Sequence, residues 1–251
     1  MGFYRVTESE SEAKARRRGI YLLPNLFTTA ALFCGFYAVV AAMHGFFEAA
    51  ASAIFIAMVF DGFDGRIARL IQCESEFGAQ FDSLSDLVAF GVAPALVSLS
   101  WSLSTLGKVG WMASFIFLVC AALRLARFNT QIGTVDKRYF VGLASPPAAA
   151  LIAAMVWVCT VKGVAVDTGV AVIAALVVAG TGLLMVSNFR YYSFKNIDIK
   201  GRIPFVALLA IIFVYVVIFI DPASVLFLCA FTYALSGPVM ALVNRKKTGT
   251  V

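Results

Sequence analysis

Long apolar stretches recur along almost the whole chain, and they limit its possible folds more than any other feature. Eight of them approach the length of a membrane-spanning helix: residues 22–44, 46–65, 84–106, 108–128, 144–162, 166–188, 203–220 and 223–243. A helix needs about 20 residues to cross the hydrocarbon core of a bilayer. None of the stretches shows the alternation of a barrel strand. The sequence therefore predicts an all-α, polytopic membrane bundle of about eight transmembrane helices.

The composition agrees with a membrane protein. Hydrophobic residues make up 61% of the chain and charged residues 14%, and the mean hydropathy is +0.91. A soluble domain is typically about half apolar and a quarter charged. The five cysteines are scattered without a CxxC pair, and His44 is the only histidine. Neither residue type therefore indicates a metal site.

The basic residues fall on one side of this helix map. Of the 20 lysines and arginines, all but Lys108 and Lys162 lie at the termini or in the loops after the second, fourth and sixth apolar stretches. By the positive-inside rule, both termini and the segment 61–86 are expected on the cytoplasmic side. This distribution accounts for the net charge of +6 without a nucleic-acid partner.

Three segments are expected along the chain. Residues 1–21 form a polar, cytoplasmic N-terminal segment whose pattern would allow a short surface helix against lipid head groups. Residues 22–243 form the membrane domain, and its first apolar run is too long for a cleaved signal peptide. Residues 244–251 form a basic cytoplasmic tail.

Four aspartates stand at the cytoplasmic edge of the second and third apolar stretches. Helical spacing puts Asp61 and Asp64 on one stripe, together with Gly65, Ala68 and Arg69. A second stripe follows if the third helix starts early, because its members are spaced four apart: Gly78, Asp82 and Asp86. The two stripes are predicted to face each other across a tight hairpin.

Such a cluster of carboxylates needs a positive partner. A charge at membrane depth costs about 2.5–3.5 kcal/mol on insertion scales, and neighbouring carboxylates repel one another. Arg69 alone is insufficient. Oxygen ligands select hard cations, so Mg²⁺ or Mn²⁺ is expected, Ca²⁺ is possible and Zn²⁺ is disfavoured. Four carboxylates can hold two such ions about 3.5–4 Å apart, the arrangement that clamps a transferring phosphoryl group.

Two other interpretations of the aspartates are open at this point. They could be ordinary interfacial residues beside Arg66 and Arg69. They could also line an ion or proton pathway, since intramembrane carboxylates serve transporters. A transporter, however, is expected to carry its charges near mid-membrane rather than at one edge.

The segment 61–86 matches a known signature. It reads D-x-x-D-G-x-x-A-R-x8-G-x3-D-x3-D without departure, and it resembles the motif of the CDP-alcohol phosphotransferases. These are integral membrane enzymes in which an incoming hydroxyl displaces CMP from a CDP-linked lipid or alcohol.

The resemblance implies a role for each matching position. Asp61, Asp64, Asp82 and Asp86 would bind two divalent ions, and Asp86 would also be the base that deprotonates the attacking hydroxyl. The CDP group would be contacted by residues of the signature and of an N-x-x-T element at the start of the first helix: Asn25, Thr28, Gly65, Arg69, Ser75 and Gly78. Without the signature, Asn25 would be interpreted as a helix cap after Pro24.

Three further segments resemble the bacterial members of this family that use CDP-diacylglycerol as donor and L-serine as acceptor. They are RLARFN at 124–129, FVGLASPPAA at 140–149 and YYSFK at 191–195. The family usually has proline where this chain has Ala144. The resemblance implies an inner-membrane enzyme that forms homodimers.

The acceptor would meet a basic group of residues. A guanidinium pair suits the carboxylate of serine, and the candidates are Arg124, Arg127, Asn129 and Lys195. These cations could instead merely obey the positive-inside rule. They could also serve a phosphorylated acceptor such as glycerol 3-phosphate or an inositol phosphate.

Overall fold

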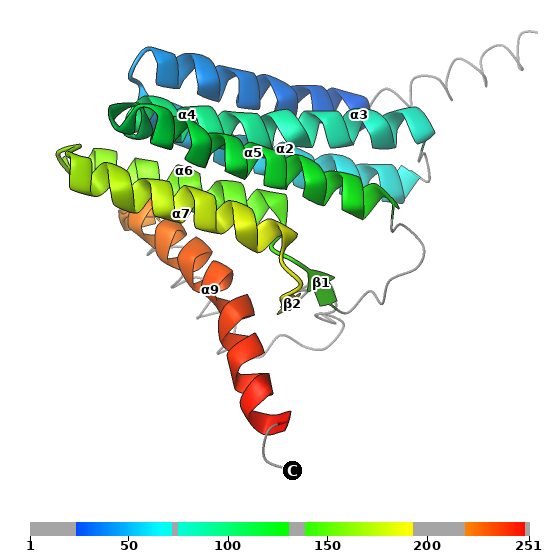
Figure 1. The fold of residues 1–251 in the computed structure, drawn as a ribbon. Helices are drawn as coiled ribbons and strands as arrows, with labels where there is room; N and C mark the ends of the chain where they lie inside the picture. Colours follow the sequence, from blue (N-terminus) through cyan, green and yellow to red (C-terminus); the bar gives the residue numbers. More distant parts are fainter. Residues whose placement is uncertain (1–23, 72–74, 131–138, 193–218, 249–251) are drawn as a thin grey trace, which may run out of the picture.

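The computed structural model describes residues 24–71, 75–130, 139–192 and 219–248. Helices dominate this part of the chain, and they run roughly side by side except for the last one (Figure 1). In chain order the helices are Pro24–Met43, α2 (Phe47–Ile71), α3 (Glu76–Asp86), a π-helical turn (Leu87–Val92), α4 (Ala93–Trp101), a 3₁₀ turn (Leu103–Leu106), α5 (Lys108–Thr130), α6 (Ser145–Val161), α7 (Thr168–Val186) and α9 (Pro222–Thr248). The predicted helical membrane class is confirmed.

The predicted number of eight spans is not reached. By length and composition, five described helices can cross a membrane: Pro24–Met43, Glu76–Trp101, Lys108–Thr130, Thr168–Val186 and Pro222–Ala241. The helix α6 is apolar but has only 17 residues, and α2 carries charged residues in its last turns. The predicted stretch 203–220 lies almost entirely outside the described residues. The described part of the chain thus supports five to seven spans.

The third span differs from its predicted bounds of 84–106. It starts at Glu76 because Ser75 caps the helix, its side-chain oxygen accepting a hydrogen bond from the Gly78 N–H at 3.0 Å. Continuous helix ends at Trp101, and the following turn closes at Gly107, whose φ of +56° few other residues tolerate. This early start places Asp82 and Asp86 within the helix, as the second stripe requires.

Small residues let the helices approach closely. The core contains many buried alanines, among them Ala50, Ala57, Ala148 and Ala153, as is typical of helix interfaces in membranes. α5 packs against α7, and α6 packs against both α2 and α9. At the crossing of α5 and α7, a Cβ added to Gly182 would lie 2.9 Å from the Cα of Phe117.

A two-stranded antiparallel ladder was not expected from the sequence. β1 (Tyr139–Val141) pairs with β2 (Arg190–Tyr192), with Phe140 opposite Tyr191. Each strand adjoins the α6–α7 hairpin, before α6 and after α7 respectively, so the packing of these helices brings the strands together. The ladder lies at the end of the bundle that carries the C-terminal end of α5 (Figure 1).

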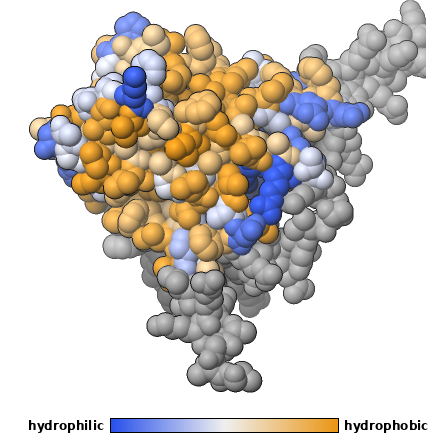
Figure 2. All heavy atoms as spheres, viewed as in Figure 1, coloured by the Kyte–Doolittle hydropathy of each residue, from blue (hydrophilic) through white to orange (hydrophobic). Residues whose placement is uncertain are grey.

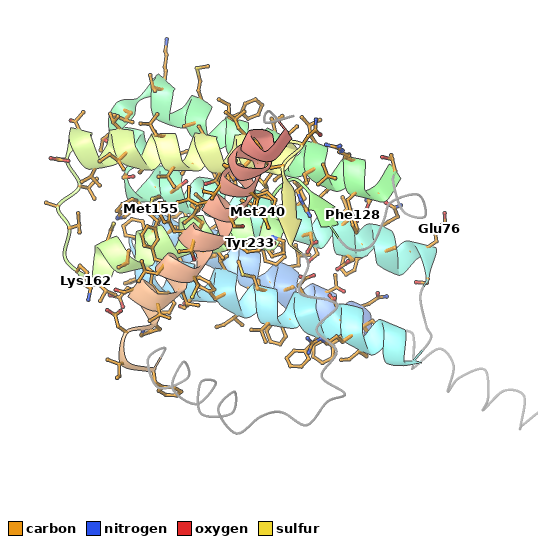
Figure 3. The ribbon with its side chains drawn as sticks, turned by 90° about the horizontal axis from the view of Figure 1, so that it is seen from below. Glu76, Phe128, Met155, Lys162, Tyr233 and Met240 are labelled. Atoms are coloured by element: carbon orange, nitrogen blue, oxygen red, sulfur yellow. The ribbon has the colours of Figure 1, made fainter. Side chains whose placement is uncertain are left out.

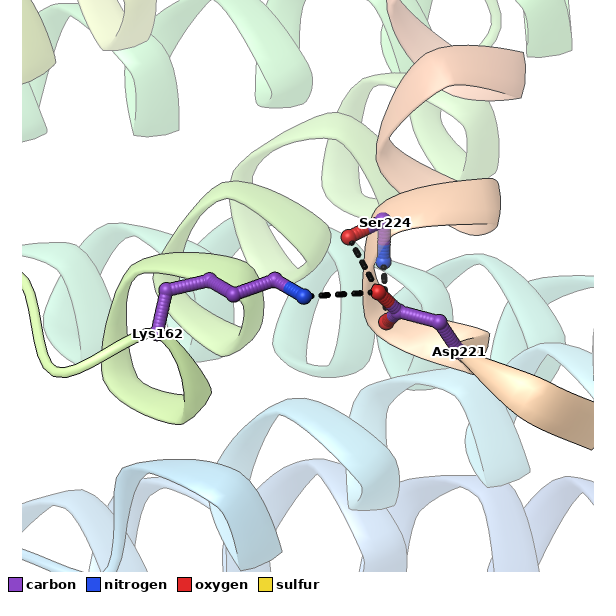
Figure 4. A network of polar contacts seen from close by, with 3 residues as sticks. All are labelled: Lys162, Asp221 and Ser224. Carbon is purple, nitrogen blue, oxygen red and sulfur yellow. Dashed lines mark hydrogen bonds and ion pairs between the residues drawn. The ribbon is translucent and has the colours of Figure 1, made fainter.

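The last helix crosses the others obliquely and projects beyond them (Figure 1). Its start is fixed by Asp221, which accepts hydrogen bonds from the Ser224 N–H and hydroxyl and from Lys162 Nζ, the last at 2.8 Å (Figure 4). The Lys162 and Ser224 bonds lower the pKa of Asp221 to about 2, so the carboxylate stays charged at neutral pH. α9 continues to Thr248, so residues 244–248 extend the helix beyond its predicted end at 243.

The surface is apolar around the middle of the bundle. Figure 2 shows hydrophobic residues over most of the face formed by α5 and α7, with hydrophilic residues gathered toward the helix ends. Large exposed side chains on these helices include Trp111, Phe115, Ile173 and Leu176. A lipid environment is the natural partner of such a belt.

The contact at Gly182 gives a test of the fold. Gly182→Ala is expected to lower the melting temperature in detergent, because the new methyl meets backbone atoms of α5 and overpacking costs about 1–3 kcal/mol. Gly180→Ala on the same helix is the matched control, since its Cβ would enter open space, and it should be neutral or slightly stabilising. Equal effects of the two variants would contradict this packing.

Candidate active site

The four predicted aspartates meet at one end of the bundle. Asp61 and Asp64 lie on α2, and Asp82 and Asp86 lie on α3. One carboxylate oxygen from each of Asp61, Asp64 and Asp82 lies within 4.8 Å of the others. The carboxyl group of Asp86 is hydrogen-bonded to that of Asp61. The two stripes predicted from helical spacing therefore do face each other.

The first helix holds one of these carboxylates in place. The Thr28 hydroxyl lies 3.0 Å from Asp64 Oδ2 and 3.1 Å from the carbonyl oxygen of Pro24. Ser85, which stands directly before Asp86, donates its hydroxyl to the carbonyl oxygen of Thr28 at 3.0 Å. Thr28, Asp64 and Ser85 are all buried. The first helix and α3 are thereby tied together at the aspartates.

A change of helix type follows directly after Asp86. Residues 87–92 form a π-helical turn, in which the Ala93 N–H donates to the Val88 carbonyl oxygen. The first helix approaches this turn closely at Gly35, where an added Cβ would lie only 2.7 Å from the Cα of Ala89. π-Helical turns often occur at functional sites, where they alter the direction of neighbouring side chains.

Most of the residues predicted to contact the CDP group also gather here. A Cβ on Gly78 would lie 3.0 Å from Ser75 Oγ and 3.4 Å from Asn25 Oδ1, so these three residues lie close together and a methyl group would require their side chains to shift. Gly65 follows Asp64 on α2 and donates its N–H to the Asp64 carboxylate. Arg69 lies in the last turns of α2, but its side chain is outside the described part. The nucleotide-binding roles of these residues stay predictions.

The two arginines predicted to bind the acceptor form hydrogen bonds with different residues. Arg124 donates from Nη1 to Ser145 Oγ at 2.6 Å and interacts electrostatically with Asp86. Arg127 donates from Nη2 to Asn188 Oδ1 at 3.2 Å. Of the two arginines, Arg124 is thus the one that interacts electrostatically with the aspartate cluster.

Of the other two residues predicted to bind the acceptor, Asn129 lies in the described part of the chain and Lys195 does not. The amide of Asn129 donates from Nδ2 to Ser83 Oγ at 3.0 Å, which joins the end of α5 to α3. Ser83 lies one position after Asp82, so Asn129 reaches the edge of the carboxylate cluster. Lys195 lies outside the described residues.

The sequence patterns do not indicate which residues bond to these side chains. Ser145, Ser83 and Asn188 each bond to a predicted site residue. Ser83 and Ser85 both lie in the three-residue gap between Asp82 and Asp86, which was a usable signal. Ser145 stands before two prolines, a pattern that indicates only the start of a helix. The neighbouring sequence gives no sign of its bond to Arg124.

The donor set suits a divalent cation. Three carboxylate oxygens converge from two helices, and no lysine or arginine forms a salt bridge to them among the described residues. Hard oxygen ligands of this kind fit Mg²⁺ or Mn²⁺. The basic and acidic residues of the site share one end of the molecule, the end marked by Glu76 and Phe128, while Lys162 lies at the other (Figure 3).

Comparison with known proteins agrees with this site. The family described as CDP-alcohol phosphatidyltransferase matches residues 21–179, which include the aspartate cluster and Arg124. The chain belongs to this family.

Several relatives of this chain share the same protein name. The chain is 36% identical over 197 residues to a CDP-diacylglycerol–serine O-phosphatidyltransferase of Helicobacter pylori, covering 78% of this chain and 83% of that protein. Proteins of the same name from Mycobacterium leprae and Bacillus subtilis are 32% and 30% identical, over 94% and 69% of this chain and 80% and 92% of their own lengths.

The bond between Thr28 and Asp64 predicts a role in metal binding. Thr28→Val keeps the side-chain shape but removes the hydroxyl, and the affinity for Mn²⁺ should fall about 10–100-fold, as is typical when a ligand loses its supporting bond. Electron paramagnetic resonance titration of the purified protein would measure this. Thr29→Val is the control, because Thr29 is exposed and, within the described residues, its hydroxyl bonds to the carbonyl oxygen of Asn25 rather than to an aspartate. Unchanged Mn²⁺ affinity in Thr28→Val would argue against Asp64 as a ligand.

Proposed function

We propose that this protein transfers the phosphatidyl group of CDP-diacylglycerol to the hydroxyl of L-serine, giving phosphatidylserine and CMP. The observation that carries the proposal is the convergence of the aspartate carboxylates at one end of a lipid-facing bundle. The names of the relatives from three organisms support the same donor and acceptor.

The aspartates would hold the metal. Asp61, Asp64 and Asp82 present converging oxygens, and Asp86 adjoins them through Asp61, which is enough to ligate two ions. Mg²⁺ or Mn²⁺ bound there would neutralise the charge of the diphosphate and of the departing CMP. Asn25, Thr28, Gly65, Ser75 and Gly78 would line the side where CDP lies, and Arg69 would pair with its phosphate.

Asp86 would act as the general base. It takes the proton of the serine hydroxyl, whose oxygen then bonds to the β-phosphorus of CDP-diacylglycerol. The bond from that phosphorus to the oxygen of CMP breaks, and CMP leaves with the electron pair. Arg124 interacts electrostatically with Asp86, and its guanidinium would bind the carboxylate of serine and hold the hydroxyl near the base. Arg127, Asn129 and Lys195 complete the proposed acceptor group.

The proposed setting is a bacterial inner membrane with the active site on the cytoplasmic side. Glu76 of α3 and Phe128 of α5 mark the end of the bundle that holds the site, whereas Lys162 lies at the opposite end (Figure 3). Arg124 and Arg127 belong to the same last turns of α5 as Phe128. Both termini would lie with the site in the cytoplasm; the surface helix predicted within residues 1–21 lies outside the described residues. The acyl chains would enter sideways from the bilayer, and the protein would form homodimers.

A CMP-release assay tests the function. The purified protein receives CDP-diacylglycerol with Mg²⁺ or Mn²⁺, and serine, glycerol 3-phosphate, inositol and inositol 1-phosphate are offered separately. Release with serine alone is expected. Release only with a phosphorylated acceptor would keep the aspartate chemistry but refute the serine pocket. No release with any acceptor would reopen the interpretation as a cation transporter.

Asp86→Asn should lower turnover about 10²–10⁴-fold, the usual contribution of a general base, while the melting temperature and CDP-lipid binding are retained. Asp167→Asn is the matched control: Asp167 caps α7 away from the carboxylate cluster, and asparagine caps a helix equally well. A near-normal rate in Asp86→Asn would remove Asp86 from the base role.

Arg124→Lys should raise the KM for serine about tenfold or more and leave the KM for CDP-diacylglycerol nearly unchanged. Lysine keeps the charge but loses the planar two-point geometry that suits a carboxylate, and a charge-assisted hydrogen bond contributes about 1.5–3 kcal/mol. Arg66→Lys, at an exposed position of α2, is the control. An equal rise of both KM values would instead assign Arg124 to the donor.

A further inference from the structure

The end of α5 carries the two arginines of the proposed acceptor group, and a hydrogen bond ties it to the carboxylate cluster. Arg124 and Arg127 are three positions apart, so their side chains leave α5 on one face. Asn129, in the last turn of the same helix, donates from Nδ2 to Ser83 Oγ at 3.0 Å. Ser83 follows Asp82 on α3. The arginines therefore stand on the part of α5 that is bonded to the helix of two aspartates.

Both arginines donate to segments that meet where α6 begins and α7 ends. Arg124 donates from Nη1 to the Oγ of Ser145, the first residue of α6, at 2.6 Å. Arg127 donates from Nη2 to Asn188 Oδ1 at 3.2 Å. Asn188 lies two positions after the end of α7 at Val186. The oxygens that hold the pair thus come from two segments that are distant in the sequence.

Backbone hydrogen bonds join these two segments. The Gly142 N–H donates to the carbonyl oxygen of Phe189 at 2.8 Å, and the Leu143 N–H donates to that of Leu184 at 3.0 Å. Gly142 has a φ of +81°, and a Cβ there would collide with the carbonyl oxygen of Met185, so another residue would strain the contact. The hydrogen-bond partners of the two arginines are therefore fixed relative to each other. The α6–α7 junction is the pair of segments 142–145 and 184–189.

The guanidinium of Arg124 depends on this junction for its orientation. Ser145 is fully buried, and the buried Nε of Arg124 has no hydrogen-bond partner among the described residues. A long side chain with few bonds can take several rotamers, and a ligand that requires one of them binds more weakly. A bond at Nη1 restricts the rotamers beforehand. The planar group is then ready for two-point binding of a carboxylate.

We propose that the α6–α7 junction presents the two arginines as one carboxylate-binding pair and so determines how tightly the acceptor binds. Ser145 is the positioning residue of Arg124, and Asn188 is that of Arg127. The proposal rests on the proposed function, which assigns both arginines to the acceptor. Both positioning residues act through the arginines and take no part in the proton transfer. Asn188 lies beyond residues 21–179, which match the family.

Ser145→Ala and Asn188→Ala test this by removing one hydrogen-bond acceptor each. Each variant should raise the KM for serine about three- to tenfold, while kcat and the KM for CDP-diacylglycerol change less than about twofold, because a guanidinium loses its orientation toward the carboxylate of serine. Ser187→Ala is the matched control. Its hydroxyl belongs to the same junction but donates to the carbonyl oxygen of Leu184 at 2.8 Å, so the serine KM should stay unchanged. Melting temperatures show whether each variant is folded.

A double-mutant cycle separates positioning from packing. In an Arg124→Ala background, Ser145→Ala should have no further effect on kcat/KM for serine, because the two residues act as one bonded pair. If the buried Ser145 cannot be replaced without unfolding, the exposed Asn188 decides through the same cycle with Arg127→Ala.

Four results would each overturn the proposal. They are an unchanged serine KM in either folded variant, an equal rise of both KM values, an equally large rise of the serine KM in Ser187→Ala, and additive effects in the cycle.

The wild-type protein keeps this proposal apart from the function itself. If the wild type releases CMP with serine but the variants keep its serine KM, the positioning role alone is overturned. If the wild type uses a phosphorylated acceptor, the serine assignment fails, and the KM for that acceptor decides the positioning role in the same variants. Absence of CMP release with every acceptor would overturn both proposals, because the arginine pair would have no acceptor to bind.

Discussion

The packing of four carboxylates at the end of an apolar bundle is the constraint on which the rest of the structure depends. Asp61, Asp64 and Asp82 bring oxygens within 4.8 Å of one another, and Asp86 bonds to Asp61. Such an arrangement is unfavourable unless a cation or protons compensate the charge. Neither α2 nor α3 could hold these groups alone. The described part of the site is therefore best understood as a frame built to present oxygen ligands to metal and substrate.

That frame consists of short polar contacts between helices that otherwise meet through small residues. Thr28 reaches Asp64 across helices, Ser85 reaches back to Thr28, and Asn129 ties α5 to Ser83. Each bond joins a buried or half-buried polar group to the carboxylate end of the bundle. The first helix and the π-helical turn approach closely at Gly35, and a larger residue there would push apart the segments that the Thr28 and Ser85 bonds join. Packing and chemistry are thus coupled at this helix crossing.

Much of the site could be predicted from the sequence because it is local. The spacing of Asp61 and Asp64, and of Gly78, Asp82 and Asp86, defines one face of each helix, whatever surrounds it. The start of α3 was less certain, and the cap at Ser75 accounts for it. The span count was wrong for the described residues, since α6 is short and α2 is charged at its end. The β1–β2 ladder was missed because three-residue strands carry no periodic signal.

By itself, the sequence determined the membrane class, the sidedness of the charges and the aspartate signature, since apolar length, loop charge and helical period are all properties of neighbouring residues. Only the tertiary structure decided which helices meet. It separated Arg124, which reaches Ser145 and the surroundings of Asp86, from Arg127, which reaches Asn188. Such contacts depend on how helices rotate and cross, and this is set by packing between distant segments that no local pattern records.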